Sequence, residues 1–194
     1  MKLPYSANSF NIGVRPLEEK DIESLRIWRS DPSNSFFLKT IGDVTTQMQL
    51  NWYRNSLLEE DSYIFAVDNT EAVDNGETRT EFVGSLAIYD VNGDIAEIGK
   101  MLIDQKSRGK KIGFTAMNLA LHIGFQKLEI HRFLLEVHED NIAAKTNYLR
   151  NGFERRGEHI YPKGGIEWDM ILDRKRFYML HPDMKGVAIL NAGL

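Results

Sequence analysis

The sequence SRGKKIG at residues 107–113 lies between a strand-like segment and a helix-like one, and it decides the fold. Before it, residues 95–103 read IAEIGKMLI, which is typical of a strand. After it, apolar residues recur at steps of three and four, which indicates an amphipathic helix over residues 113–128. The sequence therefore predicts a strand, a basic glycine-containing loop and a helix in succession.

This basic loop is suited to binding phosphate. The first turn of a helix presents unpaired backbone N–H groups and the positive end of the helix dipole, and Arg108, Lys110 and Lys111 add positive charge. A Walker loop is excluded because Lys110 is followed by Lys111, and a dinucleotide fingerprint because Gly109 and Gly113 are four residues apart. From this segment alone, a phosphate-binding loop and a solvated basic turn both remain open.

A second strand and helix follow. Residues 133–138 read FLLEVH and predict a strand, and residues 142–150 predict a helix that Glu139-Asp140-Asn141 caps and Asn151-Gly152-Phe153 ends. Asn141 and Tyr148 are roughly two turns apart at about 3.6 residues per turn. Both side chains should therefore point from one face of this helix.

The pattern R-G-x-x-[IL]-G at residues 108–113, followed by Glu136, Asn141, Tyr148 and Gly152-Phe153, resembles the core of the GCN5-related N-acetyltransferase (GNAT) superfamily. The resemblance implies an α/β fold, with a mixed, mostly antiparallel central sheet of about seven strands and helices on both faces. It also implies that two central strands splay apart to admit a coenzyme.

The coenzyme implied by the resemblance is acetyl-CoA, used as a co-substrate. Its pyrophosphate would lie on the loop, and backbone N–H groups of the preceding strand would hold the pantetheine and the thioester carbonyl. Superfamily members usually have a glycine where this chain has Lys111, so a side chain stands where backbone normally approaches phosphate. The expected coenzyme-binding residues are Met101, Leu102, Ile103, Arg108, Gly109, Lys110, Lys111, Ile112, Gly113 and Asn141.

Acetyl transfer to an amine also needs an acid and a base. An aliphatic amine with a pKa near 10.4 is only about 0.04% neutral at pH 7, so a group must take its proton. Glu136 matches the catalytic glutamate of ribosomal-protein N-terminal acetyltransferases in this superfamily, and Glu97, acting through water, is the second candidate. Tyr148 is the expected acid toward the leaving thiolate. Either glutamate could instead be a structural carboxylate paired with Arg132 or Lys100.

Composition narrows the class of protein. With 194 residues and 42% hydrophobic content, we expect one domain over residues 1–194, with a core at 12–173 and an extension at 174–194. A net charge of -4 argues against a nucleic-acid-binding surface. The absence of cysteine and of long apolar runs favours a cytoplasmic protein without a membrane segment. The five histidines are not spaced as a ligand set, so no metal is expected.

The layout resembles the branch of ribosomal-protein N-terminal, spermidine and nucleotide-linked amino-sugar acetyltransferases. The predicted function is N-acetylation of a primary amine by direct attack in a ternary complex. The partner would be a small amine, an amino-sugar nucleotide or a protein N-terminus, and a homodimer is left open. The alternative is a non-catalytic acyl-CoA sensor. Trp52 and Tyr53 belong either to the core or to the acceptor pocket.

Overall fold

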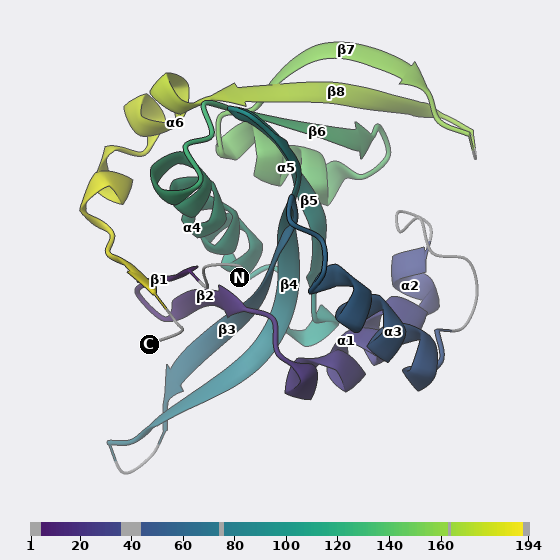
Figure 1. Ribbon diagram of the computed structural model, residues 1–194, viewed down its shortest axis with the longest axis vertical. Helices are drawn as coiled ribbons and strands as arrows, with labels where there is room; N and C mark the ends of the chain where they lie inside the picture. The colour runs from purple at the N-terminus through teal and green to yellow at the C-terminus, as the bar shows by residue number, and fades with distance from the viewer. Residues whose placement is uncertain (1–4, 36–43, 74–75, 163, 192–194) are drawn as a thin grey trace.

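The structure is a computed structural model that describes residues 5–35, 44–73, 76–162 and 164–191. Within these ranges the strands form one sheet of nine, in the order β7-β8-β6-β5-β4-β3-β2-β1-β9 (Figure 1). The strands are β1 (Tyr5–Ser9), β2 (Ile12–Pro16), β3 (Tyr63–Ala72), β4 (Thr78–Asn92), β5 (Ile95–Ile103), β6 (Arg132–His138), β7 (Glu154–Ile160), β8 (Ile166–Asp173) and β9 (Ile189–Asn191). The helices are α1 (Ile22–Ser30), α2 (Pro32–Ser35), α3 (Thr46–Ser56), α4 (Ile112–Lys127), α5 (Ile142–Arg150) and α6 (Arg174–Leu180), with 3-10 turns η1 (Glu19–Asp21), η2 (Gln105–Ser107) and η3 (Pro182–Gly186).

Helices cover both faces of this sheet, as predicted. The central helix α4 is apolar nearly all round and lies in the larger core. There the ring centre of Phe125 lies 5.0 Å from that of Phe133 and 5.3 Å from that of Phe177. A smaller core on the opposite face joins α1 and α3 to the sheet through Leu25 and Leu102. A helix buried on all sides needs this enclosure, because it has no polar face for solvent. In the residues that the structure describes, no helix is long and apolar enough to cross a bilayer.

The central strands β5 and β6 part from each other, which creates the space for a site. They are parallel, and within the described residues their pairing ends with Glu97 opposite Leu134. Beyond that point β5 remains paired with β4 alone, so the edge that faced β6 has backbone groups available to a ligand. The two strands thus form a fork, and Glu97 stands at its root.

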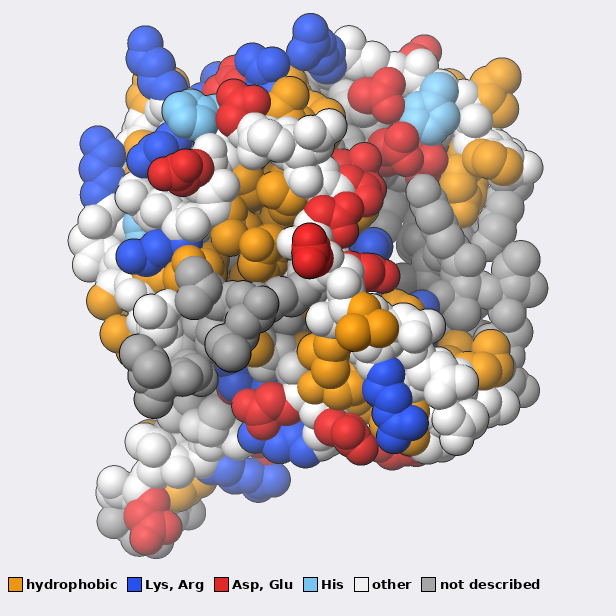
Figure 2. Space-filling view, in the orientation of Figure 1, with side chains coloured by type: hydrophobic (Ala, Val, Ile, Leu, Met, Phe, Trp, Pro, Cys, Tyr) orange, Lys and Arg blue, Asp and Glu red, His pale blue; other side chains and the backbone are white. Residues whose placement is uncertain are grey.

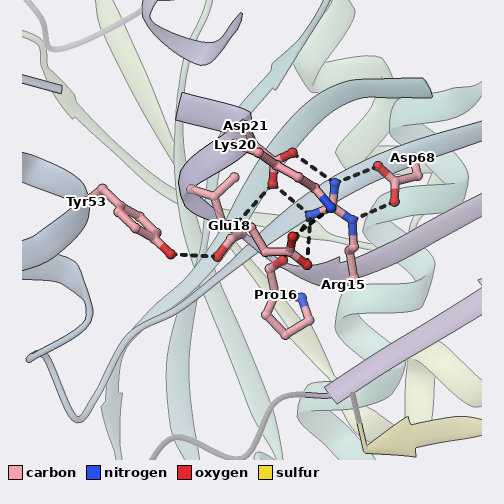
Figure 3. Close-up of polar contacts among 8 residues, drawn as sticks. Arg15, Pro16, Glu18, Lys20, Asp21, Tyr53 and Asp68 are labelled. Atoms are coloured by element: carbon pink, nitrogen blue, oxygen red, sulfur yellow. Dashed lines mark hydrogen bonds and ion pairs between the residues drawn. The ribbon is translucent and has the colours of Figure 1, made fainter. Parts of the chain in front are cut away.

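Arg15 links the turn η1, which precedes α1, to the sheet (Figure 3). Arg15 on β2 donates to both oxygens of Asp21, at 2.7 and 2.9 Å, and to both oxygens of Asp68 on β3, at 2.7 and 3.2 Å. Its hydrogen bonds with Asp21, ahead of those with Asp68, raise the pKa of Arg15 above its usual value. Such a forked, paired guanidinium holds η1 and α1 at a defined place on β2 and β3.

Two expectations about the strands need correction. The sheet has nine strands rather than about seven, because β1 and β9 pair with each other and β1 pairs with β2. The polar sequence of residues 68–80 predicts a loop, but residues 68–72 and 78–80 lengthen β3 and β4, which project from the sheet as two paired strands (Figure 1). This extension is exposed and polar, so it lacks the apolar alternation that identifies a strand, and cross-strand contacts such as Thr70 to Thr80, at 2.9 Å between hydroxyls, hold it.

Two helix caps and one hairpin turn lie where short polar patterns occur in the sequence. Asn141 Oδ1 accepts from the Ala144 N–H at 3.1 Å as the cap of α5, and Thr45 caps α3 through the Met48 N–H at 3.2 Å. Asn92 and Gly93 turn β4 back into β5, with Gly93 at a φ of 61°. These contacts span a few residues, which is why short sequence patterns could identify them.

Candidate active site

A cavity of about 1010 Å³ opens where β5 and β6 part. Figure 2 shows the molecule hollowed on the face where this fork lies. The cavity brings together nearly all the residues expected from the sequence, while Lys110 is exposed and lies outside its lining. The expected residues that line it are Glu97, Met101, Leu102, Ile103, Arg108, Gly109, Lys111, Ile112, Gly113, Glu136, Asn141 and Tyr148.

The loop before α4 has the shape of a phosphate cradle. Gly109 has a φ of 78°, and a Cβ built on it would meet no atom within 4 Å. Lys111, the N-cap of α4, has a φ of 62° and a ψ of 6°. It therefore keeps the left-handed backbone that a glycine would adopt there, at a cost of about 1–2 kcal/mol. The open loop, the helix N-terminus and the nearby cations fit a pyrophosphate.

Arg108 and Asn147 fix the two sides of this loop. Arg108 Nε donates to the Ile103 carbonyl at 3.1 Å, and its guanidinium also contacts Asn34. Asn147 Nδ2, on α5, donates to the Gly113 carbonyl at 3.3 Å and lies 3.6 Å from the sulfur of Met101. Sequence reasoning missed Asn147, although it lies one residue before Tyr148 on a helix already assigned to the site.

A bulge interrupts β5 beside the cavity. The register between β4 and β5 shifts between Ser85 and Ala87, and Lys100 has a φ of 51°. The Lys100 ammonium lies 3.9 Å from the centre of the Tyr89 ring. A bulge re-aims the residues that follow it, here Met101 to Ile103, where the thioester was expected. A non-glycine residue with positive φ carried no recognisable sequence signal.

Tyr148 is buried against the core, with its ring 5.9 Å from that of Phe153. Burial raises the pKa of Tyr148 to about 12. Full proton transfer to a thiolate of pKa near 8.5 would therefore cost about 5 kcal/mol, compared with about 2 kcal/mol for an ordinary tyrosine. The hydroxyl stays protonated at neutral pH, and its chemistry is that of a hydrogen-bond donor.

Glu97 is coupled to a tyrosine that sequence reasoning did not select. Tyr89 lies directly opposite Glu97 across β4 and β5. Burial, followed by the charge of Glu97 and a hydrogen bond with it, raises the pKa of Tyr89 well above its usual range, and Tyr148 contributes to the same environment. Glu97, Tyr89 and Tyr148 all line the cavity. In the sequence, Tyr89 reads as one more alternating strand residue.

Glu136 lies on the outer arm of the fork. Its Oε1 is 4.0 Å from His159 Nε2 on β7, and its side chain is 44% exposed. The cations considered as structural partners have other contacts: Arg132 pairs with Asp173 at 3.0 Å, and Lys100 lies over Tyr89. The two candidate bases thus occupy different surroundings: Glu97 is half-buried at the root of the fork, and Glu136 is exposed.

The acceptor side of the cavity contains Trp52 and Arg29. Trp52 both packs against the smaller core and lines the cavity, with the Arg29 guanidinium 5.3 Å from its ring centre. Burial lowers the pKa of Arg29. Tyr53 contributes to the core, where its hydroxyl contacts the Leu17 carbonyl at 3.4 Å. The choice between core and pocket is therefore resolved differently for the two aromatic residues.

A family model for the acetyltransferase (GNAT) domain matches residues 11–154. The chain belongs to the GNAT acetyltransferase family. The N-acetyltransferase 9-like protein of Nematostella vectensis is 25% identical over 161 residues, which is 79% of this chain and 80% of the relative. This GNAT protein is thus an acetyl-CoA-dependent N-acetyltransferase, and the predicted family, enzyme class and co-substrate are confirmed.

Solved GNAT structures share the fold at low sequence identity. Spermidine N-acetyltransferase from Vibrio cholerae, in complex with CoA and spermine, is similar with a TM-score of 0.73 and 18% identity, covering 86% of this chain and 98% of that chain. RimJ of Mycobacterium smegmatis, in complex with CoA-disulfide, is similar with a TM-score of 0.74 and 16% identity, covering 95% and 94%. The predicted fold class is confirmed by these similarities.

Proposed function

We propose that this GNAT enzyme acetylates a primary amine that carries positive charge, by direct attack on the thioester in a ternary complex. The observation that carries this proposal is the acidic lining of the cavity away from the phosphate cradle, formed by Asp90, Glu97, Glu136 and Glu167. Arg29, Lys100 and Arg150 also line the cavity, and Arg29 and Lys100 are placed over aromatic rings. A small polyamine-like amine or a basic protein N-terminus fits this lining better than an amino-sugar nucleotide, whose phosphates it would repel.

The coenzyme would lie along the fork. Its pyrophosphate would contact the backbone from Gly109 to Gly113 with Arg108 and Lys111 nearby, and its pantetheine would follow the edge of β5 that β6 leaves open. The side-chain oxygen of Asn141 accepts the hydrogen bond that caps α5, so its amide nitrogen can donate to the coenzyme. When bound, acetyl-CoA supplies an electrophilic thioester and a thiolate leaving group.

Glu97 is the base that the geometry favours. Removing the amine proton at pH 7 costs about 4.6 kcal/mol, which a carboxylate reached directly or through one water can partly offset. Glu97 stands at the root of the fork in the same environment as Tyr148, whereas Glu136 lies on the outer arm beside His159. Glu136 would then attract the cationic acceptor, which reverses the order of preference expected from the sequence.

Tyr148 donates a hydrogen bond to the thiolate as it develops. Its raised pKa keeps the hydroxyl protonated, so that a donor is present throughout turnover. Backbone N–H groups after the β5 bulge stabilise charge on the carbonyl oxygen without a special side chain. In this proposal Glu97 acts as the base, the backbone of β5 stabilises the oxyanion, and Tyr148 stabilises the thiolate.

A thiol-release assay with acetyl-CoA tests the function. The panel contains polyamines, basic and acidic N-terminal peptides, aminoglycosides and amino-sugar nucleotides at matched concentration and ionic strength. We expect the highest kcat/KM with a cationic amine and a loss of rate as salt increases. Preference for an amino-sugar nucleotide would refute the assigned acceptor class. Tight coenzyme binding without turnover of any amine would favour the acyl-CoA sensor instead.

A further inference from the structure

Three strands bring a histidine and two glutamates together beside the acceptor end of the cavity. His159 on β7, Glu167 on β8 and Glu136 on β6 each offer a ligand atom, and these atoms lie within 4.8 Å of one another. His159 Nε2 is 3.4 Å from Glu167 Oε2 and 4.0 Å from Glu136 Oε1. Figure 2 shows acidic and histidine side chains gathered above the hollow, over the region of β6, β7 and β8.

The orientation of His159 places its Nε2 beside two carboxylates. Its Nδ1 lies 3.0 Å from Asp169 Oδ1, so in the neutral ring Nδ1 donates to Asp169 and Nε2 carries the lone pair. That lone pair faces the carboxylates of Glu136 and Glu167. Two carboxylates around Nε2 are stabilised by positive charge at that place, which a proton on Nε2 or a bound cation supplies. A carboxylate behind the other nitrogen is also the usual support of a metal-bound histidine.

The state of Glu167 supports the same conclusion independently. Its residue is 8% exposed, and a buried carboxylate normally has hydrogen-bond donors around it. The ion-pair contact of the Glu167 carboxylate is with His159 Nε2, at 3.4 Å. Glu167 also lines the cavity. A cation that enters from the cavity can therefore reach this carboxylate and the histidine together.

We propose that Glu136, His159 and Glu167 bind one divalent transition-metal ion of the Zn²⁺ class, with Asp169 orienting the histidine. For bonds of about 2.0–2.1 Å in a tetrahedral site, neighbouring ligand atoms lie roughly 3.3 Å apart, close to the contact between His159 and Glu167. Glu136 is the more exposed side chain and can close its 4.0 Å gap by a small rotation. An imidazole with two carboxylates suits Zn²⁺ better than Mg²⁺. Spacing along the chain did not reveal this set, because two of its three ligands are glutamates.

The ion would regulate acetylation, a consequence that rests on the proposed function. Glu136 and Glu167 belong to the acidic lining that is proposed to attract the amine. A bound divalent cation neutralises the two carboxylates there and competes with a cationic acceptor. The phosphate cradle is built from other elements, the loop before α4 and the edge of β5, so coenzyme affinity stays unchanged.

The binding test needs no acceptor. Chelator-treated protein is titrated with Zn²⁺ at pH 7.5 by calorimetry and by competition with a chromophoric chelator. We expect one ion per chain, with affinity reduced about tenfold or more in His159→Asn and Glu167→Gln, and about tenfold in Asp169→Asn. His131→Asn, which removes an exposed histidine before β6, is the matched control and should bind as wild type does. Circular dichroism verifies that each variant is folded.

Unchanged Zn²⁺ affinity in folded His159→Asn or Glu167→Gln would overturn the site. For the regulatory role, Zn²⁺ should raise the KM for the amine in wild type, leave acetyl-CoA affinity unchanged and lose its effect in His159→Asn. Inhibition that persists in His159→Asn, or that acts on acetyl-CoA affinity, would overturn that role. If the screen finds no acceptor, the proposed function fails while the binding result still decides the metal site.

Discussion

Tyr89 and Glu97 lie directly opposite each other across β4 and β5, and they share a hydrogen bond. The tyrosine donates and the carboxylate accepts, which holds Glu97 toward the root of the fork. Tyr148 belongs to the same electrostatic environment. A proton acceptor and a proton donor are therefore directed at the place where β5 and β6 part.

Replacing Glu97 by Gln removes the proposed base. We expect kcat/KM for the amine to fall at least about tenfold at pH 7. The deficit should shrink as pH rises, because the neutral fraction of the amine grows about tenfold per pH unit below its pKa. Rate profiles from pH 6.5 to 9.5 measure this.

Glu136→Gln is the matched comparison for the base. With Glu97 as the base, this change should raise the KM of a cationic acceptor and leave kcat within about threefold of wild type. If Glu136→Gln lowers kcat more than Glu97→Gln does, Glu136 is the base and the assignment is reversed.

Tyr148→Phe tests the thiolate partner. Turnover should fall at least about tenfold, because the donor to the departing sulfur is lost. Acetyl-CoA affinity, measured by calorimetry, should hardly change, since the phosphate cradle is untouched. Wild-type turnover in Tyr148→Phe would show that another group stabilises the thiolate.

The buried hydroxyl of Tyr148 also predicts a pH dependence of stability. Its folded-state pKa is about 12, above the unfolded value near 10, so the folded state binds the proton more tightly. Its stabilising contribution is complete below about pH 10 and is lost as pH rises through about 12, by up to about 2.7 kcal/mol. Denaturant unfolding from pH 8 to 11 should show a shallower alkaline decline in Tyr148→Phe, while the other buried tyrosines supply the shared background.

Lys111→Gly separates backbone strain from charge in the phosphate cradle. Relief of the left-handed conformation should stabilise the fold by about 0.5–1 kcal/mol, or about 2–3 °C in Tm. Coenzyme affinity should weaken by about twofold to fivefold, with the difference shrinking at high salt. Lys110→Gly, at the exposed neighbour outside the cavity, should bring no gain in stability. A lower Tm for Lys111→Gly would contradict the strain that we assign.

Arg15→Ala should destabilise the fold, because it leaves Asp21, which is 3% exposed, without its guanidinium partner. The expected loss is about 2–4 kcal/mol in the free energy of unfolding. Arg15→Lys keeps the charge but cannot donate to both carboxylates in a fork, so an intermediate loss is expected. A loss within about 0.5 kcal/mol for Arg15→Ala would show that the network is replaced by other contacts.

Sequence reasoning succeeded where one segment carries its own signal. The loop and helix around Gly109, the cap at Asn141 and the turn at Asn92 each depend on contacts within a few residues, and all are in place. It failed for β1 and β9, which are short strands at one end of the sheet; β9 forms the edge, and β1 lies between β9 and β2. Tyr89 was missed for a related reason, since its role depends on which residue lies opposite in the next strand.

The sequence by itself determined that a basic loop opens a helix and that Tyr148 follows a capped turn, because backbone geometry and periodicity act over one or two helical turns. Tertiary structure alone decided that Lys111 adopts a left-handed backbone, that β5 and β6 part after Glu97, and that Glu136, His159 and Glu167 meet. These features depend on the register of strands that are distant in the chain. Register is set by packing of the whole sheet, which no local pattern encodes.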